Sequence, residues 1–334
     1  MSKHIDEPNR KILRSTLIVL IAACAIVGIL LFAFLRIRAF LKPHRVEHDD
    51  ISIDELNRLD YDEDYYCIQQ NNMEDPDEVM TVVVFGDDTF AYDRGPDGLA
   101  AMIAERTNAT VYNCAFEGSS YACDSAVLDW ENHPMDCFSP YRLLIALRDR
   151  YFDVYDVAYS HMDTVPDYFR DTVSLIQSID FDTVDVILLQ YGIHDYLAGH
   201  TNTDILDTAE SDVSTVHSAI VQSVQLIRDL FPHVQIVVSS PCFGYYTRED
   251  GSLVSGDLVR TGSEISDNLP GYWGNIKATA AGLDVTFIDN YCGYNVNMDN
   301  AAQYMTAGSP IVPNVEGRKI MADHIADVLL HHLY

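Results

Sequence analysis

Two short polar segments carry the residue types that acid–base or metal chemistry requires. Residues 86–88 (Gly-Asp-Asp) follow the apolar run 81–85, and residues 192–195 (Gly-Ile-His-Asp) follow a second apolar run that ends at Gln190. A carboxylate can act as a nucleophile while an imidazole activates water. Carboxylates beside a histidine can alternatively bind a divalent cation. The first candidate site residues are therefore Asp87, Asp88, His194 and Asp195.

Two of these side chains also have a structural interpretation. Asp195 can cap a helix, and His194 can be a hydrogen-bonded pocket residue. We favour these roles over new catalysis. His161 and His200, in predicted loops near the same site, are the other imidazoles that could serve as a base.

The elements that must position these residues alternate between short apolar runs and longer runs with helical spacing. Most short runs are almost continuously apolar, as in strands that are covered on both faces. This alternation predicts an α/β fold with a five-stranded parallel sheet. The predicted strands are 81–85, 110–114, 184–190, 234–239 and 285–288, and the predicted helices are 98–106, 141–150, 167–179, 212–230, 272–281 and 315–331.

The predicted topology brings three segments to one edge of the sheet. In open α/β sheets, ligands bind beyond the carboxyl ends of the strands, where the strand order reverses. Asp88, Gly118 and His194 all follow predicted strands and should be neighbours there. The long loops 118–139 and 242–266 are the likeliest to contact a ligand. Rings on or near them could stack on sugars, and we single out Tyr245, Tyr246 and Trp273.

Four segments, in order, resemble blocks of the SGNH/GDSL hydrolase family, in its membrane-anchored bacterial form. They are residues 81–88 (TVVVFGDD), 111–118 (VYNCAFEG), 191–195 (YGIHD) and the flanks of a last block within 304–319. The resemblance covers roughly residues 81–333. It implies a flavodoxin-like three-layer sandwich, as in esterases, lipases and carbohydrate deacetylases. The resemblance also implies that Gly118 is the glycine whose backbone N–H binds the substrate oxyanion, and that Asp87 braces the turn before Asp88.

The sequence departs from that family at its reactive positions. Asp88 stands where the family has its nucleophilic serine, and His194 stands where it has an asparagine that donates to the oxyanion. Ser309 and Val312 replace the aspartate and the histidine of the last block. Because that histidine must take the hydroxyl proton and return it, these losses predict an esterase fold without esterase chemistry. Whether the protein is an enzyme stays open at this point.

The N-terminal region predicts a membrane anchor. Residues 17–35 contain 19 residues without a charge, and about 20 apolar residues cross the hydrocarbon core as a helix. We expect a tail at 1–14, an uncleaved transmembrane helix at 15–37, an acidic linker at 38–79 and the SGNH-like domain at 80–334. The linker's tyrosines and Cys67 could still dock on that domain. Flanking charges are nearly balanced, so the extracytoplasmic location of the domain follows mainly from the family resemblance.

Charge and cysteines limit the partners. Residues 1–45 leave 13 basic and 49 acidic residues, a net charge of −36, for the rest of the chain. Such a domain repels nucleic acid and anionic headgroups. No cysteine–histidine cluster has zinc spacing, so we expect neither a metal nor a cofactor. Cys123 and Cys137 form a plausible local disulfide.

We therefore expect a single-pass membrane protein with a degenerate hydrolase domain. Its first predicted function is a pseudo-esterase that binds a cell-envelope glycan or assists envelope assembly, for example beside a membrane acyltransferase. The alternative is an active esterase or deacetylase on acylated surface polysaccharide or lipid, rewired through Asp88 and His194. A third hypothesis is a cation-dependent site at the four residues first named.

Overall fold

The computed structural model describes residues 64–67, 79–202, 212–262, 267–294 and 296–333. Its centre is a parallel sheet in the order β2-β1-β3-β4-β7. These strands are β1 (Thr81–Gly86), β2 (Thr110–Asn113), β3 (Val186–Gln190), β4 (Gln235–Ser239) and β7 (Thr286–Ile288). Each of the five strands predicted from sequence is present, and the parallel sheet is confirmed.

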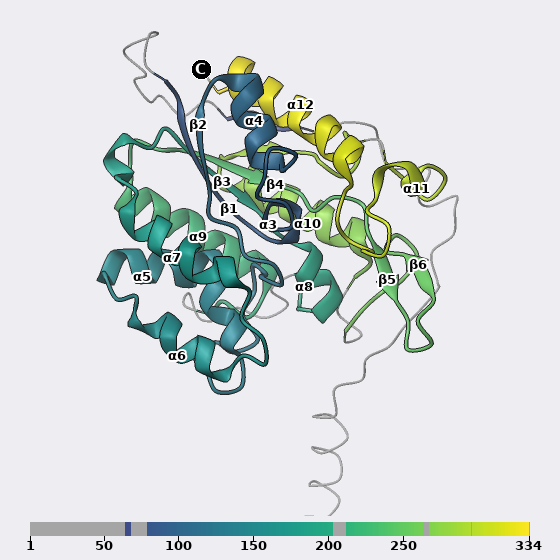
Figure 1. The fold of residues 1–334 in the computed structure, drawn as a ribbon, viewed down its shortest axis with the longest axis horizontal. Coiled ribbons are helices and arrows are strands. Elements are labelled where there is room, and N and C mark those ends of the chain that lie inside the picture. Colours follow the sequence, from purple (N-terminus) through teal and green to yellow (C-terminus); the bar gives the residue numbers. More distant parts are fainter. Residues whose placement is uncertain (1–63, 68–78, 203–211, 263–266, 295, 334) are drawn as a thin grey trace, which may run out of the picture. The chain divides into compact units, whose positions relative to one another are not determined.

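Helices cover both faces of this sheet (Figure 1). Alternate residues of β1 point to opposite sides: Val83 and Phe85 pack with one core cluster, and Val82 and Val84 with the other. Because both faces are buried, the strand reads as continuously apolar rather than alternating. The first cluster contains residues of α5 (Pro140–Asp149), α6 (Asp153–His161), α7 (Asp167–Ser178), α9 (Val216–Leu230) and α10 (Leu269–Gly282); the second contains residues of α4 (Leu99–Thr107) and α12 (Val315–His331).

The last helix begins and ends where its sequence pattern predicts. Asn314 caps α12, because its side-chain oxygen accepts a hydrogen bond from Gly317 N at 3.0 Å. Other elements were not predicted: α6, two 3₁₀ helices, three short helices and an antiparallel hairpin. They are η1 (Pro134–Phe138), η2 (Phe181–Thr183), α3 (Asp88–Ala91), α8 (Ile193–Ala198), α11 (Ala301–Tyr304), β5 (Tyr245–Thr247) and β6 (Leu253–Ser255).

Residues 64–67 form a strap along the edge strand β7. Tyr65 N donates to Phe287 O at 3.1 Å, and Phe287 N donates to Tyr65 O at 2.8 Å, which makes an antiparallel bridge. Cys67 N donates to Thr286 Oγ1 at 3.1 Å, and the Asp64 carboxylate contacts His324 of α12 at 2.8 Å. This part of the predicted linker is therefore packed on the domain, and it covers backbone groups of an edge strand.

The predicted tail, membrane helix and most of the linker (residues 1–63) lie outside the described residues. Within the described ranges, no helix combines the length and apolar character that a membrane crossing needs. All six cysteines of these ranges are free thiols, so the predicted disulfide between Cys123 and Cys137 is wrong. Both thiols are buried in the core, where a cysteine packs as a small apolar residue.

Candidate functional site

The carboxyl ends of β1 and β3, with the loop after β2, bring Asp88, Gly118 and His194 together. Asp88 is the first residue of α3, and one residue, Asp87, separates it from the end of β1. Gly118 follows β2 in a left-handed conformation with φ of 79°, which glycine adopts without strain. His194 lies in the first turn of α8, directly after β3. The sheet edge predicted from sequence is thus the place where these residues meet.

One oxygen of Asp88 is the centre of this site. Asp88 Oδ2 accepts a hydrogen bond from Gly118 N at 2.7 Å and lies 2.5 Å from His194 Nε2. The side chains of His194 and Asp88 are 23% and 17% exposed, so solvent still reaches the pair. The Gly118 N–H therefore points at an oxygen from a distance at which oxyanion-hole donors act.

The contact shifts the pKa values of both groups toward their charged forms. Burial favours neutral forms and would lower the pKa of His194, but the hydrogen bond and charge of Asp88 outweigh it and raise that pKa. Burial likewise would raise the pKa of Asp88, but the contact with His194 and the Gly118 N–H lower it. Both pKa shifts therefore favour the charged forms of Asp88 and His194.

Asp87 has the bracing position that the family resemblance implies. It is fully buried, and its Oδ1 accepts a hydrogen bond from Thr89 N at 3.0 Å as the N-cap of α3. Burial, and then the neighbouring charge of Asp88, raise the pKa of Asp87 to about 7. Asp87 therefore orients the turn that carries Asp88 and does not itself face solvent.

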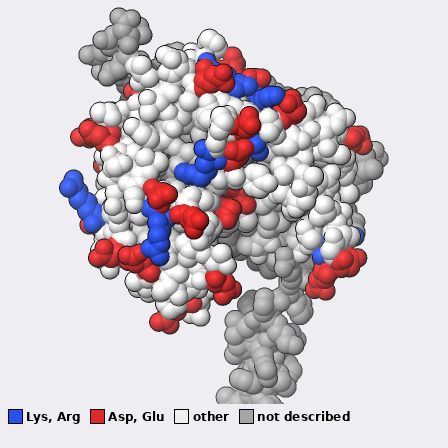
Figure 2. Space-filling view, in the orientation of Figure 1, with Lys and Arg blue, Asp and Glu red and all other residues white. Residues whose placement is uncertain are grey.

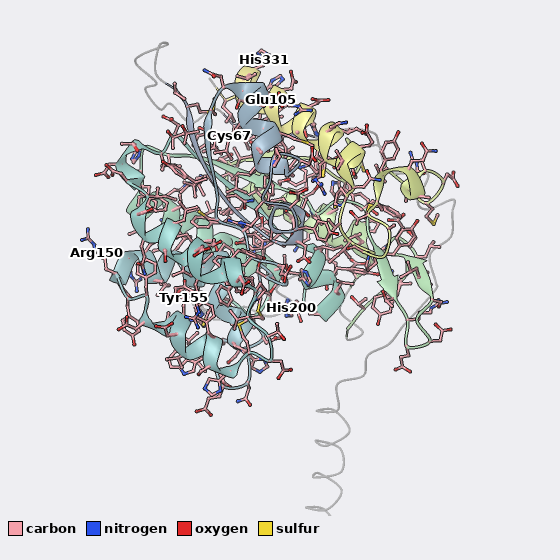
Figure 3. The ribbon with its side chains drawn as sticks, in the orientation of Figure 1. Cys67, Glu105, Arg150, Tyr155, His200 and His331 are labelled. Carbon is pink, nitrogen blue, oxygen red and sulfur yellow. The ribbon has the colours of Figure 1, made fainter. Side chains whose placement is uncertain are left out.

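Asp195 faces the loop that carries Gly118 rather than the Asp88 carboxylate. Its two oxygens accept hydrogen bonds from Tyr121 N and Ala122 N, each at 2.8 Å. His200 Nδ1 lies 3.1 Å from Asp195 Oδ1, and His200 Nε2 lies 3.1 Å from Asp124 Oδ1. Figure 3 labels His200 beside the end of α8. Asp195 thus fixes the loop behind Gly118, and His200 compensates its buried charge.

These orientations disagree with a cation site on Asp87, Asp88, His194 and Asp195. Asp195 is committed to the loop, and the Asp87 oxygen with a partner is committed to α3. In the described part of the chain, no three His, Cys, Asp or Glu side chains converge as metal ligands do. On the face drawn in Figure 2, acidic side chains are scattered among uncharged surface rather than gathered in one patch.

His161, which we predicted in a loop, is the last residue of the helix α6, and it is exposed.

The last block forms an apolar wall where the resemblance implies a base. Val312, at the position of the family histidine, is 1% exposed. Ile311 and Val312 belong to the same core cluster as Ile193, the residue before His194. The backbone N–H of Ser309 donates to Thr306 O at 3.0 Å. The described site therefore presents neither the carboxylate nor the imidazole of a serine hydrolase at these positions.

The predicted stacking residues need a correction. Tyr246 is 6% exposed and Trp273 is 7% exposed. The Trp273 indole N–H donates to Asp289 Oδ1 at 2.9 Å, which fixes its ring inside the domain. Trp273 lies in α10, and Tyr246 lies in β5, where its ring centre is 6.3 Å from that of Tyr196 in α8. Only Tyr245, which is half-buried, keeps exposed surface.

Two residues near the site were not singled out from sequence. Glu117 directly precedes Gly118, and its N–H donates to the Tyr168 hydroxyl oxygen at 3.0 Å. Burial, and then the charge of Asp88, raise the pKa of Glu117, so the two carboxylates lie within electrostatic range. Glu117 was visible in the sequence only as part of a block. Tyr168 lies on α7, and no local sequence signal connects it with residues 117–118.

Comparison with solved structures reveals the same fold elsewhere. One solved structure is 17% identical and aligns with a TM-score of 0.54 over 77% of this chain and 98% of its own length. A possible lipase from Chitinophaga pinensis is 14% identical over 75% of this chain and 98% of its own, with a TM-score of 0.44. A GDSL-like lipase from Bacteroides thetaiotaomicron is 12% identical over 75% of this chain and 87% of its own, with a TM-score of 0.40. No family model and no curated protein matches the sequence.

The strand order, the three-segment site and the first of these alignments define the class of protein. The chain has an SGNH/GDSL hydrolase-like fold. Within that fold, the Asp88 carboxylate contacts Gly118 N and His194 Nε2. This arrangement can accept hydrogen bonds and hold a charge pair.

Proposed function

We propose that this protein is a membrane-anchored, extracytoplasmic pseudo-esterase that binds a glycan of the cell envelope. The proposed loss of esterase activity rests on a single observation, the position of Asp88 Oδ2. It lies at hydrogen-bonding distance from Gly118 N and His194 Nε2, the two groups that would stabilise a substrate oxyanion. The oxyanion hole is therefore retained and filled by the protein's own carboxylate.

This arrangement argues against the rewired esterase. A carboxylate nucleophile must attack the acyl carbon with one oxygen while other donors receive the developing negative charge. In this site the donors already bind Asp88, and its negative charge would repel that oxyanion. The same carboxylate raises the pKa of His194 and so favours its protonated form, which cannot accept a proton as a general base.

Binding without turnover is supported by what remains open at the sheet edge. Asp88 and His194 are partly exposed, and Glu117 and Tyr168 lie next to them. Carboxylate, imidazole and hydroxyl groups can hydrogen-bond the hydroxyl groups of a sugar. The envelope location follows from the apolar run at residues 17–35 and from the family resemblance, and a role beside a membrane acyltransferase would be compatible with it.

The activity test compares the full-length protein in detergent with Asp88→Ala and with a rebuilt triple variant, Asp88→Ser, Ser309→Asp and Val312→His. The substrates are short acyl esters and acetylated sugars, and intact mass spectrometry detects any acyl adduct. We expect no turnover and no adduct for the wild type or Asp88→Ala. Wild-type hydrolysis that disappears in Asp88→Ala would overturn the proposal and favour the rewired enzyme. An acyl adduct on the introduced serine of the rebuilt variant would show that the three substituted positions are sufficient to restore esterase chemistry.

A further inference from the structure

We propose that the ligand carries a primary amine, as in an amino sugar, and that Glu117 and Tyr168 recognise it. This inference rests on the proposed glycan-binding function and specifies the chemical class of the glycan. The first observation concerns charge. Asp88 and His194 form an ion pair across 2.5 Å, so their charges offset one another. The neighbouring carboxylate of Glu117 then gives the site a net negative charge.

The Glu117 carboxylate is available to a ligand. The side chain is half-buried, and its two oxygens have no hydrogen-bond or ion-pair partner among the residues that the structure describes. A carboxylate that is partly removed from water and has no partner is stabilised when a cation or a hydrogen-bond donor binds it. An ammonium group supplies both a charge and three donors.

The backbone of Glu117 holds this carboxylate in place. Its N–H donates to the Tyr168 hydroxyl at 3.0 Å, and the next N–H, that of Gly118, donates to Asp88 at 2.7 Å. Because the Tyr168 oxygen accepts the Glu117 N–H, its own hydrogen is available to a ligand hydroxyl. The guanidinium of Arg94 lies 4.8 Å from the centre of the Tyr168 ring, which further restrains that residue.

The nearby cation does not cancel the charge of Glu117. Arg94 donates to Ala115 O at 3.2 Å and to Asn113 O at 2.6 Å, so its donors are directed at backbone carbonyls. Asp195 is neutralised by His200 on the far side of the Gly118 loop. The site therefore repels anionic sugars, binds uncharged ones through hydrogen bonds, and binds an amino sugar with an added ionic contact.

The experiment measures binding of three tetrasaccharides to the full-length protein in detergent by calorimetry. The probes are a glucosamine tetramer, the fully N-acetylated tetramer and a galacturonic acid tetramer. We expect the glucosamine tetramer to bind at least tenfold more tightly than the acetylated one, and the galacturonic acid tetramer not to bind. Glu117→Gln should abolish this preference, because the amide keeps the size of the side chain and loses its charge.

Two further variants separate recognition from folding. Glu105→Gln is the matched control, since Glu105 is an exposed residue of α4 (Figure 3) and should leave the preference unchanged. Tyr168→Phe keeps the ring and should weaken both uncharged and amino tetramers. Equal affinity for the amino and acetylated tetramers, or a preference that survives Glu117→Gln, would overturn this inference and leave glycan binding standing. Failure of every tetramer to bind the wild type would overturn glycan binding itself, and this inference with it.

Discussion

Two carboxylate–histidine pairs in this molecule have the same chemistry and different surroundings. Asp88 and His194 lie at the carboxyl edge of the sheet, 2.5 Å apart, with side chains 17% and 23% exposed. Asp64 and His324 join the strap to α12, 2.8 Å apart, with side chains 5% and 17% exposed. The second pair lies deeper and holds two distant segments of the chain together.

The difference lies in what else each carboxylate binds. Asp64 also accepts hydrogen bonds from Asp289 N at 2.6 Å and from the Tyr66 hydroxyl at 2.8 Å, all from groups that pack the strap. Asp88 accepts instead from Gly118 N, a donor that the fold presents toward the place of a substrate oxygen. We therefore propose that a similar ion pair is a structural clamp in one place and a filled binding site in the other.

The largest effect should come from breaking the clamp. Asp64→Ala leaves His324 and the Asp289 N–H without this acceptor, and loss of one partner of a buried pair costs about 3 kcal/mol. Urea denaturation should report that loss of unfolding free energy. The control is Asp323→Ala, because Asp323 pairs with Arg106 but is 70% exposed, and exposed pairs contribute about 0.5 kcal/mol. Equal effects of the two variants would show that the strap does not stabilise the domain.

A third histidine in the described part of the chain, His200, also contacts carboxylates. His200 lies between Asp195 and Asp124, and although burial alone lowers its pKa, their hydrogen bonds raise the pKa to about 10. Since this value exceeds the ordinary 6.5, the stabilisation is complete below pH 6.5 and is lost as pH rises through 10. We expect the unfolding free energy to fall by about 2 kcal/mol between pH 8 and pH 10. His200→Gln should be less stable at pH 7 and should flatten this dependence; an unchanged slope in the variant would contradict the assignment.

The sequence predicted the sheet better than the surroundings of its site. Nearly continuous apolar runs locate β1, β3, β4 and β7, which are buried on both faces. The edge strand β2 is only partly buried and was located from a mixed run. Asp88, Gly118 and His194 could be placed together, because strand ends meet at one edge. The Tyr168 contact with Glu117 depends on how α7 packs over a loop 51 residues earlier. Likewise, Trp273 looks available on a helix next to a long loop, but it packs in the core and donates its indole N–H to Asp289. Such contacts are fixed by tertiary packing and leave no local signal.

The smallest effect should come from emptying the filled site, and it is the most specific test of the comparison. Asp88→Ala frees the Gly118 N–H and the His194 N–H, so a small carboxylate can bind where the Asp88 oxygen was. Acetate at about five times its dissociation constant should raise the unfolding free energy of this variant by about 1 kcal/mol. Asp88→Asn is the matched control, because its amide oxygen can still accept from Gly118 N and should keep the site filled. Thermal unfolding in sodium acetate and in sodium chloride of equal ionic strength separates anion binding from screening. A response in Asp88→Asn or in the wild type as large as that in Asp88→Ala would mean that acetate binds elsewhere. In that case Asp88 would be, like Asp64, a structural partner of its histidine and not an occupant of the oxyanion hole.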